Sequence, residues 1–560
     1  MLNQSTGCAV HNSGTLVASR EVRIFGPPGC GKTTTIKRLV IEKCKEYGSE
    51  SILIASFTKT AARQVVSQHL PVDDQQIGTL HAHAFRALDR PKLVNKPALE
   101  EWNRQYPTRP FADGFKALDL DDPYKDQDQS ALQQGDALLQ KLNLYRGLLT
   151  DREGWPLSLQ SFHEDWTAFK QSQDLLDFTD LIEICYFDQA PIPRGARVLF
   201  LDEAQDFSPL ELALARQWGE SCDEFFLAAD DDQTLYAFKG ADPQAFLTPA
   251  LPPEQVRVLE QSYRVPRAVH ALACSWVEQL TLRQPKVYRP RDFEGTVDRL
   301  PVTYKYLASL RDPLAGWLKD KKTVALLASC SYMVDPIKHQ LRAWGIPFHN
   351  PWRRSRGDWN PLLGKKDSVS AAQRVLAYLR PSRNEGWWTY RDLWDWAGVI
   401  ESERIFAHGA KTAMRRKAED ELTSSQPVET SDLEAWIVDP QAPQATIAGD
   451  LAWYQAHLLK SAQKPIAYAC SIVEACGVEA LTTIPQTVIG TVHSVKGGEC
   501  DVVILFPDLS RAGFEEWCSP GVRRDSIVRM FYVGMTRAKE SLYLADAASP
   551  VAVVLSGGAA

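Results

Sequence analysis

Short apolar runs that end in polar or glycine-rich turns recur along this 560-residue chain in two separate blocks. The first block carries them at residues 22–25, 51–58, 198–201 and 225–229. A helical pattern follows the first run directly, over residues 33–41. Alternating strand and helix units of this kind predict a parallel sheet that binds ligands at the carboxyl ends of its strands.

The second block repeats this pattern later in the chain. Apolar runs at 323–328, 502–505 and 542–544 predict buried strands, and residues 332–344 predict a helix that ends before Gly345. A second parallel sheet is therefore expected.

Two long stretches, 90–176 and 380–480, interrupt the alternation of strands and helices; their sequence is polar, contains tryptophans and has a helical pattern. Each is predicted to be a mainly helical insertion, so the expected fold class is α/β with two interrupted parallel sheets. The tryptophans of the second stretch could form a stacking platform, but ordinary burial tendencies favour a helical core. They are Trp387, Trp388, Trp394 and Trp396.

Composition narrows the class of protein. The chain is 44% hydrophobic and 24% charged, as in ordinary globular proteins, and its length predicts several domains. With a net charge of −7, the protein as a whole does not attract a polyanion, so nucleic-acid binding would need a local basic channel. The 11 cysteines form no C-x-x-C pair, which argues against a zinc or iron–sulfur site.

The sequence shows neither a leader pattern nor an apolar run of about 18 residues. The protein is therefore expected to be intracellular and not bound to a membrane.

The clearest chemical signal is a complete G-x-x-x-x-G-K-[ST] phosphate-binding loop between the first strand and the first helix. Its backbone N–H groups would surround the phosphates of a nucleotide, Lys32 would reach the β- and γ-phosphates, and the Thr33 hydroxyl would bind Mg²⁺. A glycine-rich turn that matches by chance is disfavoured because both flanks fit. The predicted nucleotide-binding residues are Gly26, Pro27, Pro28, Gly29, Cys30, Gly31, Lys32, Thr33 and Thr34.

Two carboxylates, Asp202 and Glu203, directly follow the apolar run at 198–201. ATP hydrolysis needs one carboxylate for the Mg²⁺ shell and another to orient or deprotonate the attacking water. We assign Asp202 to the metal and Glu203 to the water. A similar run delivers residues 230–233, with aromatic and cationic side chains shortly after, a combination suited to bases and phosphates.

In their order along the chain, these motifs resemble those of UvrD/Rep/PcrA-type superfamily 1 (SF1A) DNA helicases. The resemblance includes D-F-x-D-L at 177–181, D-E-x-Q-D at 202–206 and the T-x-H-x-x-K-G-x-E pattern at 491–499. The other matching stretches are 26–33, 56–62, 78–81, 230–241, 259–264 and 531–538.

The resemblance implies roles for residues that spacing alone does not assign. Gln233 would sense the γ-phosphate, Tyr263 would stack on the adenine and Glu499 would hold the ribose. Arg264 and Arg537 would act as arginine fingers on an ATP held between two domains. The DNA contacts implied are Phe57, Thr58, His81, Phe238, Lys239 and His493.

The resemblance also implies two RecA-like P-loop domains with insertions. These are domain 1A (1–89 and 177–255), insertion 1B (90–176), domain 2A (256–379 and 481–560) and insertion 2B (380–480). The chain departs from the family pattern at several positions. Among them, no glutamine stands at the expected distance before the phosphate loop, and Gly498 replaces a usual leucine.

The function expected from this resemblance is an ATP- and Mg²⁺-dependent translocase on single-stranded DNA that unwinds duplex DNA, 3′ to 5′. A related 5′ to 3′ helicase and a nucleotide-switched DNA-binding subunit without unwinding activity are the alternatives, and no residue excludes an RNA track. Expected partners are single-stranded DNA, its junctions with duplex, and unidentified replication or repair proteins. We expect a monomer or weak self-association in the cytosol of a bacterial or phage-infected cell, near the nucleoid.

Overall fold

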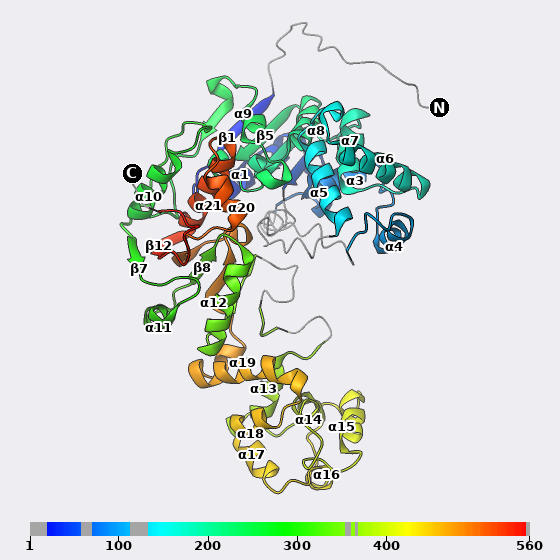
Figure 1. The fold of residues 1–560 in the computed structure, drawn as a ribbon, viewed down its shortest axis with the longest axis vertical. Helices are drawn as coiled ribbons and strands as arrows, with labels where there is room; N and C mark the ends of the chain where they lie inside the picture. Colours follow the sequence, from blue (N-terminus) through cyan, green and yellow to red (C-terminus); the bar gives the residue numbers. More distant parts are fainter. Residues whose placement is uncertain (1–19, 58–69, 113–132, 353–359, 364–367, 556–560) are drawn as a thin grey trace. The chain divides into compact units, whose positions relative to one another are not determined.

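The computed structural model describes residues 20–57, 70–112, 133–352, 360–363 and 368–555 (Figure 1). The chain divides into two compact units. Of the described residues, the first unit contains those up to Tyr263 and a separate segment, Leu282–Arg289. The second unit contains Arg264–Thr281 and the chain from Pro290 onward.

The first unit is built on a six-stranded sheet in which every pair of neighbouring strands is parallel. Its strand order is β3-β2-β4-β5-β1-β6. The strands are β1 (Glu21–Phe25), β2 (Ile52–Ser56), β3 (Ile77–Thr79), β4 (Val198–Asp202), β5 (Glu224–Ala229) and β6 (Val256–Val258).

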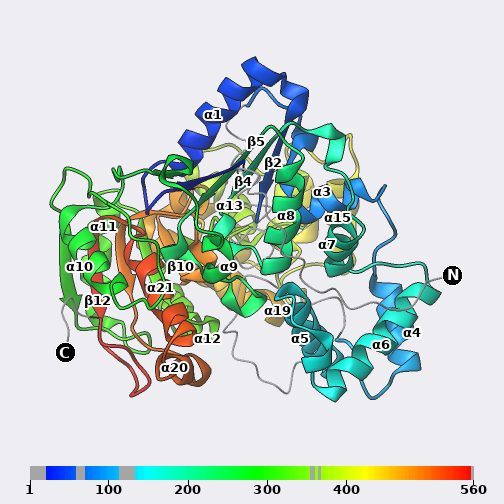
Figure 2. The same ribbon diagram turned by 90° about the horizontal axis from the view of Figure 1, so that it is seen from above.

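Successive side chains of these strands point to opposite faces, and helices cover both faces. Val198 and Phe200 of β4 share a core with α1 (Lys32–Tyr47), while Leu199 and Leu201 share one with α3 (Leu80–Ala87), α7 (Phe178–Phe187) and α8 (Pro209–Glu220). Figure 2 shows α1 and α8 on opposite sides of β2, β4 and β5. Burial on both faces explains why these strands read as continuous apolar runs.

The insertion between β3 and β4 has a core of its own. Trp102 is fully buried there, with its ring 4.0 Å from that of Tyr106 and 5.0 Å from that of Trp166. Its helices are α4 (Lys96–Gln105), α5 (Gln134–Gly147) and α6 (Leu157–Ser172).

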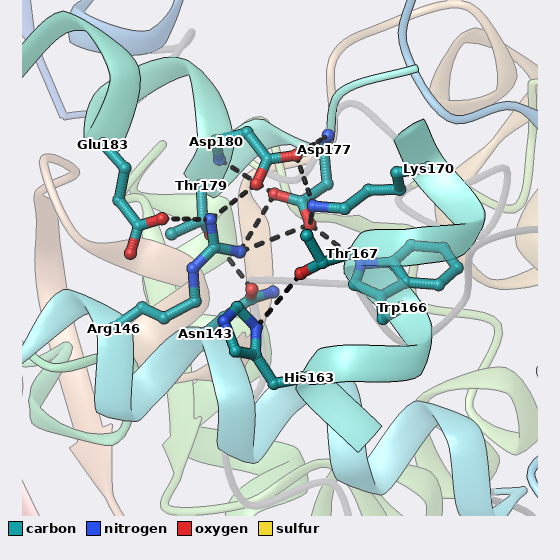
Figure 3. Close-up of polar contacts among 10 residues, drawn as sticks. All are labelled: Asn143, Arg146, His163, Trp166, Thr167, Lys170, Asp177, Thr179, Asp180 and Glu183. Carbon is teal, nitrogen blue, oxygen red and sulfur yellow. Dashed lines mark hydrogen bonds and ion pairs between the residues drawn. The ribbon is translucent and has the colours of Figure 1, made fainter. Parts of the chain in front are cut away.

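A charge network ties this insertion to α7 (Figure 3). Arg146 of α5 donates hydrogen bonds to the carboxylates of Asp177, Asp180 and Glu183, and Lys170 of α6 contacts Asp177 at 2.6 Å. Burial raises the pKa of Asp177, but Arg146 and Lys170 outweigh this effect, so its pKa lies below the usual range. The D-F-x-D-L stretch therefore begins α7 and anchors two helices of the insertion.

The second unit contains another six-stranded sheet of parallel neighbours, in the order β7-β12-β11-β8-β10-β9. Its strands are β7 (Thr296–Leu300), β8 (Val324–Ala328), β9 (Phe348–His349), β10 (Thr487–Thr491), β11 (Cys500–Leu505) and β12 (Ala538–Ala545). The helices that accompany it are α10 (Arg267–Val277), α11 (Arg311–Lys319), α12 (Ser331–Ala343), α20 (Arg511–Trp517) and α21 (Val522–Met535).

The second insertion lies between β9 and β10 and is helical, as predicted. Trp388 and Trp396 are fully buried in it, which confirms that they are core residues, whereas Trp387 is partly exposed. Its helices are α13 (Ala371–Leu379), α14 (Tyr390–Ala397), α15 (Ala410–Glu419), α16 (Thr430–Trp436), α17 (Ala442–Ala448), α18 (Leu451–Ala456) and α19 (Lys460–Cys476) (Figure 1).

The predicted α/β class is thus confirmed, but two predicted boundaries need correction. β6 pairs with β1, so the first sheet extends beyond residue 255, the predicted end of domain 1A. The second insertion begins before residue 380, because Tyr378 of α13 stacks on Tyr454 of α18 with 4.3 Å between ring centroids. Over the described ranges, no helix is both long enough and apolar enough to cross a membrane.

Candidate functional site

The phosphate loop connects β1 to α1, as the sequence predicts. Gly29 and Gly31 have positive φ angles of 76° and 77°, a backbone conformation that glycine adopts without strain. No side chain caps the N-terminus of α1, and its first turn contains no acidic residue. Unpaired N–H groups at such a helix end, together with its dipole, favour an anion, so the loop fits a phosphate group.

Lys32 lies over this loop. Its Nζ donates a hydrogen bond to the carbonyl of Gly26 at 2.8 Å and lies 3.9 Å from Oε1 of Glu203. A Cβ atom on Gly26 would lie 2.1 Å from Cγ of Lys32. Only glycine therefore leaves room for the lysine stem at this position.

Two hard oxygen ligands for a divalent cation are available at the same edge of the sheet. Asp202 is the last residue of β4, and Thr33 is in the first turn of α1. Carboxylate and hydroxyl oxygens suit Mg²⁺, so these residues fit the predicted metal role. The next residue, Glu203, has a left-handed backbone conformation (φ 54°), so the chain turns away from the strand immediately after Asp202.

A chain of hydrogen bonds joins the water-activating candidate Glu203 to the γ-phosphate candidate Gln233. Gln205 donates from Nε2 to Glu203 at 2.6 Å and accepts at Oε1 from the backbone N–H of Asp230 at 3.0 Å. Asp230 in turn accepts a 2.6 Å hydrogen bond from Nε2 of Gln233. The fold thus brings together two residues that are 30 positions apart in the sequence.

The predicted adenine-stacking residue, Tyr263, also reaches the phosphate loop. Its backbone N–H donates to the carbonyl of Gly29 at 2.9 Å, and Oγ of Ser262 donates to the carbonyl of Pro28 at the same distance. Tyr263 is 73% exposed. An exposed ring held beside the loop by its backbone suits stacking on a base.

The remaining nucleotide candidates gather in the second unit. Nε of Arg264 lies 2.7 Å from the Glu499 carboxylate. Arg537 is buried and donates to the carbonyls of Gly498 and Val533 at 3.2 and 3.0 Å. Both predicted arginine fingers are therefore held beside residues 498 and 499.

Three of the predicted DNA contacts form one aromatic and cationic cluster in the first unit. Nζ of Lys239 lies 5.3 Å from the ring centroid of Phe57 and 5.8 Å from that of Phe238. Tyr236 completes the cluster, with its ring 4.7 Å from the same Nζ. Tyr236 was not among the predicted contacts, although its position two residues before Phe238 in the sequence could have indicated it.

The other predicted DNA contacts are His81, His493 and Thr58. Nδ1 of His81 is 3.6 Å from the Glu211 carboxylate. Burial lowers the pKa of His81. The Glu211 carboxylate opposes this effect, whereas the positive charge of Lys239 lowers the pKa further. His493 is buried in the second unit. Thr58 lies outside the described residues.

Sequence reasoning missed the partners of Asp230, Asp231 and Asp232, which are fully buried. Lys286 and Arg283 pair with them. The available signal was physical, because three consecutive acids after a buried strand require cations nearby.

Two family models match the chain. The model described as the UvrD/REP helicase N-terminal domain matches residues 9–250, and that described as the UvrD-like helicase C-terminal domain matches residues 471–549. Together the two matched ranges include the phosphate loop, Glu203, Gln233, Glu499 and Arg537.

Curated proteins with similar sequences carry helicase names. The ATP-dependent DNA helicase PcrA of Bacillus subtilis is 24% identical over 298 residues, which are 48% of this chain and 39% of that protein. The ATP-dependent DNA helicase srs2 of Schizosaccharomyces pombe is 21% identical over 381 residues, 59% of this chain and 42% of that protein. The ATP-dependent DNA helicase Rep of Buchnera aphidicola subsp. Baizongia pistaciae is 22% identical over 410 residues, 67% of this chain and 60% of that protein. The matched region thus spans from 39% to 60% of the length of these relatives.

Proposed function

Because the chain belongs to the UvrD/Rep family of helicases, we propose that it is an ATP- and Mg²⁺-dependent motor that moves along single-stranded DNA and unwinds duplex DNA in the 3′ to 5′ direction. Its two sheets would be the cores of two RecA-like domains. The 3′ to 5′ direction rests on the family resemblance.

The observation that carries this proposal is the convergence of three motifs in the first unit. Lys32 approaches Glu203 to 3.9 Å, and Gln205 and Asp230 link Glu203 to Gln233. A phosphate-binding lysine, a candidate base and a candidate γ-phosphate sensor are what phosphoryl transfer to water requires.

Each residue would have a distinct task in hydrolysis. Glu203 would accept a proton from the attacking water, with its carboxylate oriented by Gln205. Mg²⁺ bound to Thr33 and Asp202 would neutralise charge on the phosphates. Arg264 and Arg537 would stabilise the charge that develops on the transferred phosphoryl group, since a guanidinium presents several fixed donors.

The cluster of Phe57, Tyr236, Phe238 and Lys239 would contact the DNA strand. Aromatic faces stack on any base, and a lysine offers a charge to the phosphates without selecting a sequence. Phe238 and Lys239 are only five and six residues beyond Gln233, so a conformational change at the γ-phosphate can be transmitted to the DNA contact through a short stretch of backbone.

Strand displacement on tailed duplexes tests the proposal. Duplexes with a 3′ tail, a 5′ tail or no tail would be incubated with the full chain, ATP and Mg²⁺, with the Glu203→Gln variant as the matched control. We expect displacement from the 3′-tailed substrate only, and none by the variant.

The other outcomes each contradict part of the proposal. Displacement from the 5′-tailed substrate alone would reverse the direction. DNA-stimulated ATP hydrolysis without displacement would identify a nucleotide-switched DNA-binding protein. Absence of ATP hydrolysis with and without DNA would overturn the motor function.

A further inference from the structure

Eight residues, Leu282–Arg289, form a segment that we call the strap. The strap belongs to the first unit, although the residues directly before and after it belong to the second. It contacts the segments that carry the phosphate loop and Gln233, so its side chains are candidates for a role in hydrolysis.

Lys286 of the strap is the common partner of three consecutive carboxylates. Its Nζ lies 3.1 Å from Asp230, 2.5 Å from Asp231 and 3.0 Å from Asp232. Arg283 binds both carboxylate oxygens of Asp232, at 3.0 and 2.7 Å.

The cluster is almost completely removed from water. The Lys286 side chain is 1% exposed and those of the three aspartates 0 to 1%. The pKa of Lys286 lies above its usual value because the three carboxylates outweigh its burial. Burial raises the pKa of Asp231, an effect that Lys286 opposes. Loss of this cation would leave buried acids without adequate compensation.

The cluster continues into the hydrolytic residues through Asp230. Its carboxylate accepts from Gln233 at 2.6 Å, and its backbone N–H donates to Gln205, which holds Glu203. A second residue of the strap touches the phosphate loop, since the Tyr288 hydroxyl donates to the carbonyl of Pro28 at 3.0 Å.

We propose that Lys286 is a positioning residue for ATP hydrolysis: it fixes Asp230, and through Asp230 it holds Gln233 and Glu203 in register with the phosphate loop. This inference rests on the proposed function, because it assigns Lys286 to the hydrolytic step of the same site. Lys286 acts through its neighbours and does not itself touch the nucleotide.

The test uses the entire 560-residue chain with two variants. Lys286→Met combined with Asp231→Asn removes one cation and one anion together, so the formal charge of the cluster is unchanged and the fold is expected to survive. Arg289→Met is the matched control, because it removes a strap cation that pairs with Glu260 at 2.9 Å while both side chains remain well exposed.

Two measurements are made on each variant. In steady-state ATP hydrolysis, the double variant should lose about tenfold or more in kcat, while its affinity for a non-hydrolysable ATP analogue changes less than about threefold. In hydrogen exchange followed by mass spectrometry, residues 230–236 of the double variant should exchange about tenfold faster than in the wild type. Arg289→Met should match the wild type in both.

The second measurement separates this proposal from the proposed function. If the wild type does not hydrolyse ATP, the motor function fails and the exchange of residues 230–236 alone decides the role of Lys286. Unchanged exchange in the folded double variant overturns the positioning role. A wild-type kcat in that variant, with an active wild type, overturns it as well.

Discussion

Two glycines leave space that a neighbouring side chain occupies. Gly26 makes room for the stem of Lys32. At Gly498, an added Cβ would lie 2.4 Å from the ring of Trp352. The departure from the family's leucine at residue 498 therefore has a physical reason, because the indole of Trp352 fills the place of that side chain.

Gly498→Leu should lower the free energy of unfolding by about 1 to 3 kcal/mol, since it forces a side chain into the indole of Trp352. Urea unfolding at equilibrium measures this. The control is Gly316→Ala, because an added Cβ at that position of α11 would meet no atom within 4 Å beyond its chain neighbours and the backbone of its own helix. Adding Trp352→Ala to Gly498→Leu should recover part of the loss, and purely additive effects would contradict the explanation.

Glu203→Gln should lower kcat for ATP hydrolysis by about 10²- to 10⁴-fold, because the amide cannot accept the proton of water. Its size is unchanged, so nucleotide and DNA affinities should remain near those of the wild type. Steady-state hydrolysis and fluorescence binding assays measure both. Undiminished turnover would exclude Glu203 as the base.

At the scale of elements, most interior strands could be predicted because burial on both faces produces continuous apolar runs, as in β4, β5 and β8. The interior strand β10 was missed, because it reads T-V-I-G-T and its threonines and glycine interrupt the apolar run. Edge strands were missed. β7 reads T-V-D-R-L with most of its residues exposed, and β9 has only two residues, so neither carries a clear pattern. The boundary error at residue 255 has the same cause, because the edge strand β6 contains an exposed arginine.

The candidate site was predictable where a single continuous segment carries the chemistry, as in the phosphate loop and the pair Asp202 and Glu203. Lys286 and Trp352 were not predictable in this way. Each acts on a segment at least 50 residues away in the sequence, and only the tertiary fold sets such a contact.

The short 3₁₀ helix that carries Lys239, Ala237–Lys239, presents the aromatic and cationic cluster. Lys239→Met should weaken binding to single-stranded DNA of every sequence and reduce the slope of log K against log salt by about 0.7, the value for one phosphate contact. Fluorescence anisotropy over a salt series measures this. Lys92→Met, at an exposed lysine paired with Asp174, is the control, and an equal loss in that variant would argue against a specific contact.

For the molecule as a whole, the net charge of −7 means that any attraction to DNA is local. Titratable groups are also distributed through both units. Burial lowers the pKa of His83, His163 and His349 to about 4. These three histidines are therefore neutral in the folded protein at pH values where they would be charged in the unfolded chain.

The sign of the pH effect follows. A histidine whose pKa is lower in the folded state stabilises the fold fully above about pH 6.5, and this contribution is lost as the pH falls toward 4. The free energy of unfolding, measured by urea titration, should decrease between pH 7.5 and pH 5 by at most about 2 kcal/mol for each histidine. His349→Gln should show a smaller decrease than the wild type; an identical decrease would mean that His349 contributes nothing.

The strand order of the second sheet has a consequence for synthesis of the chain. Among the strands described, β7 pairs with β12, β8 pairs with β10 and β11, and β9 pairs with β10. None of the first three therefore finds a partner until residues beyond the second insertion have left the ribosome. Three strands with open edges must wait through well over a hundred codons, and during that interval they need protection by chaperones or by local collapse to avoid aggregation.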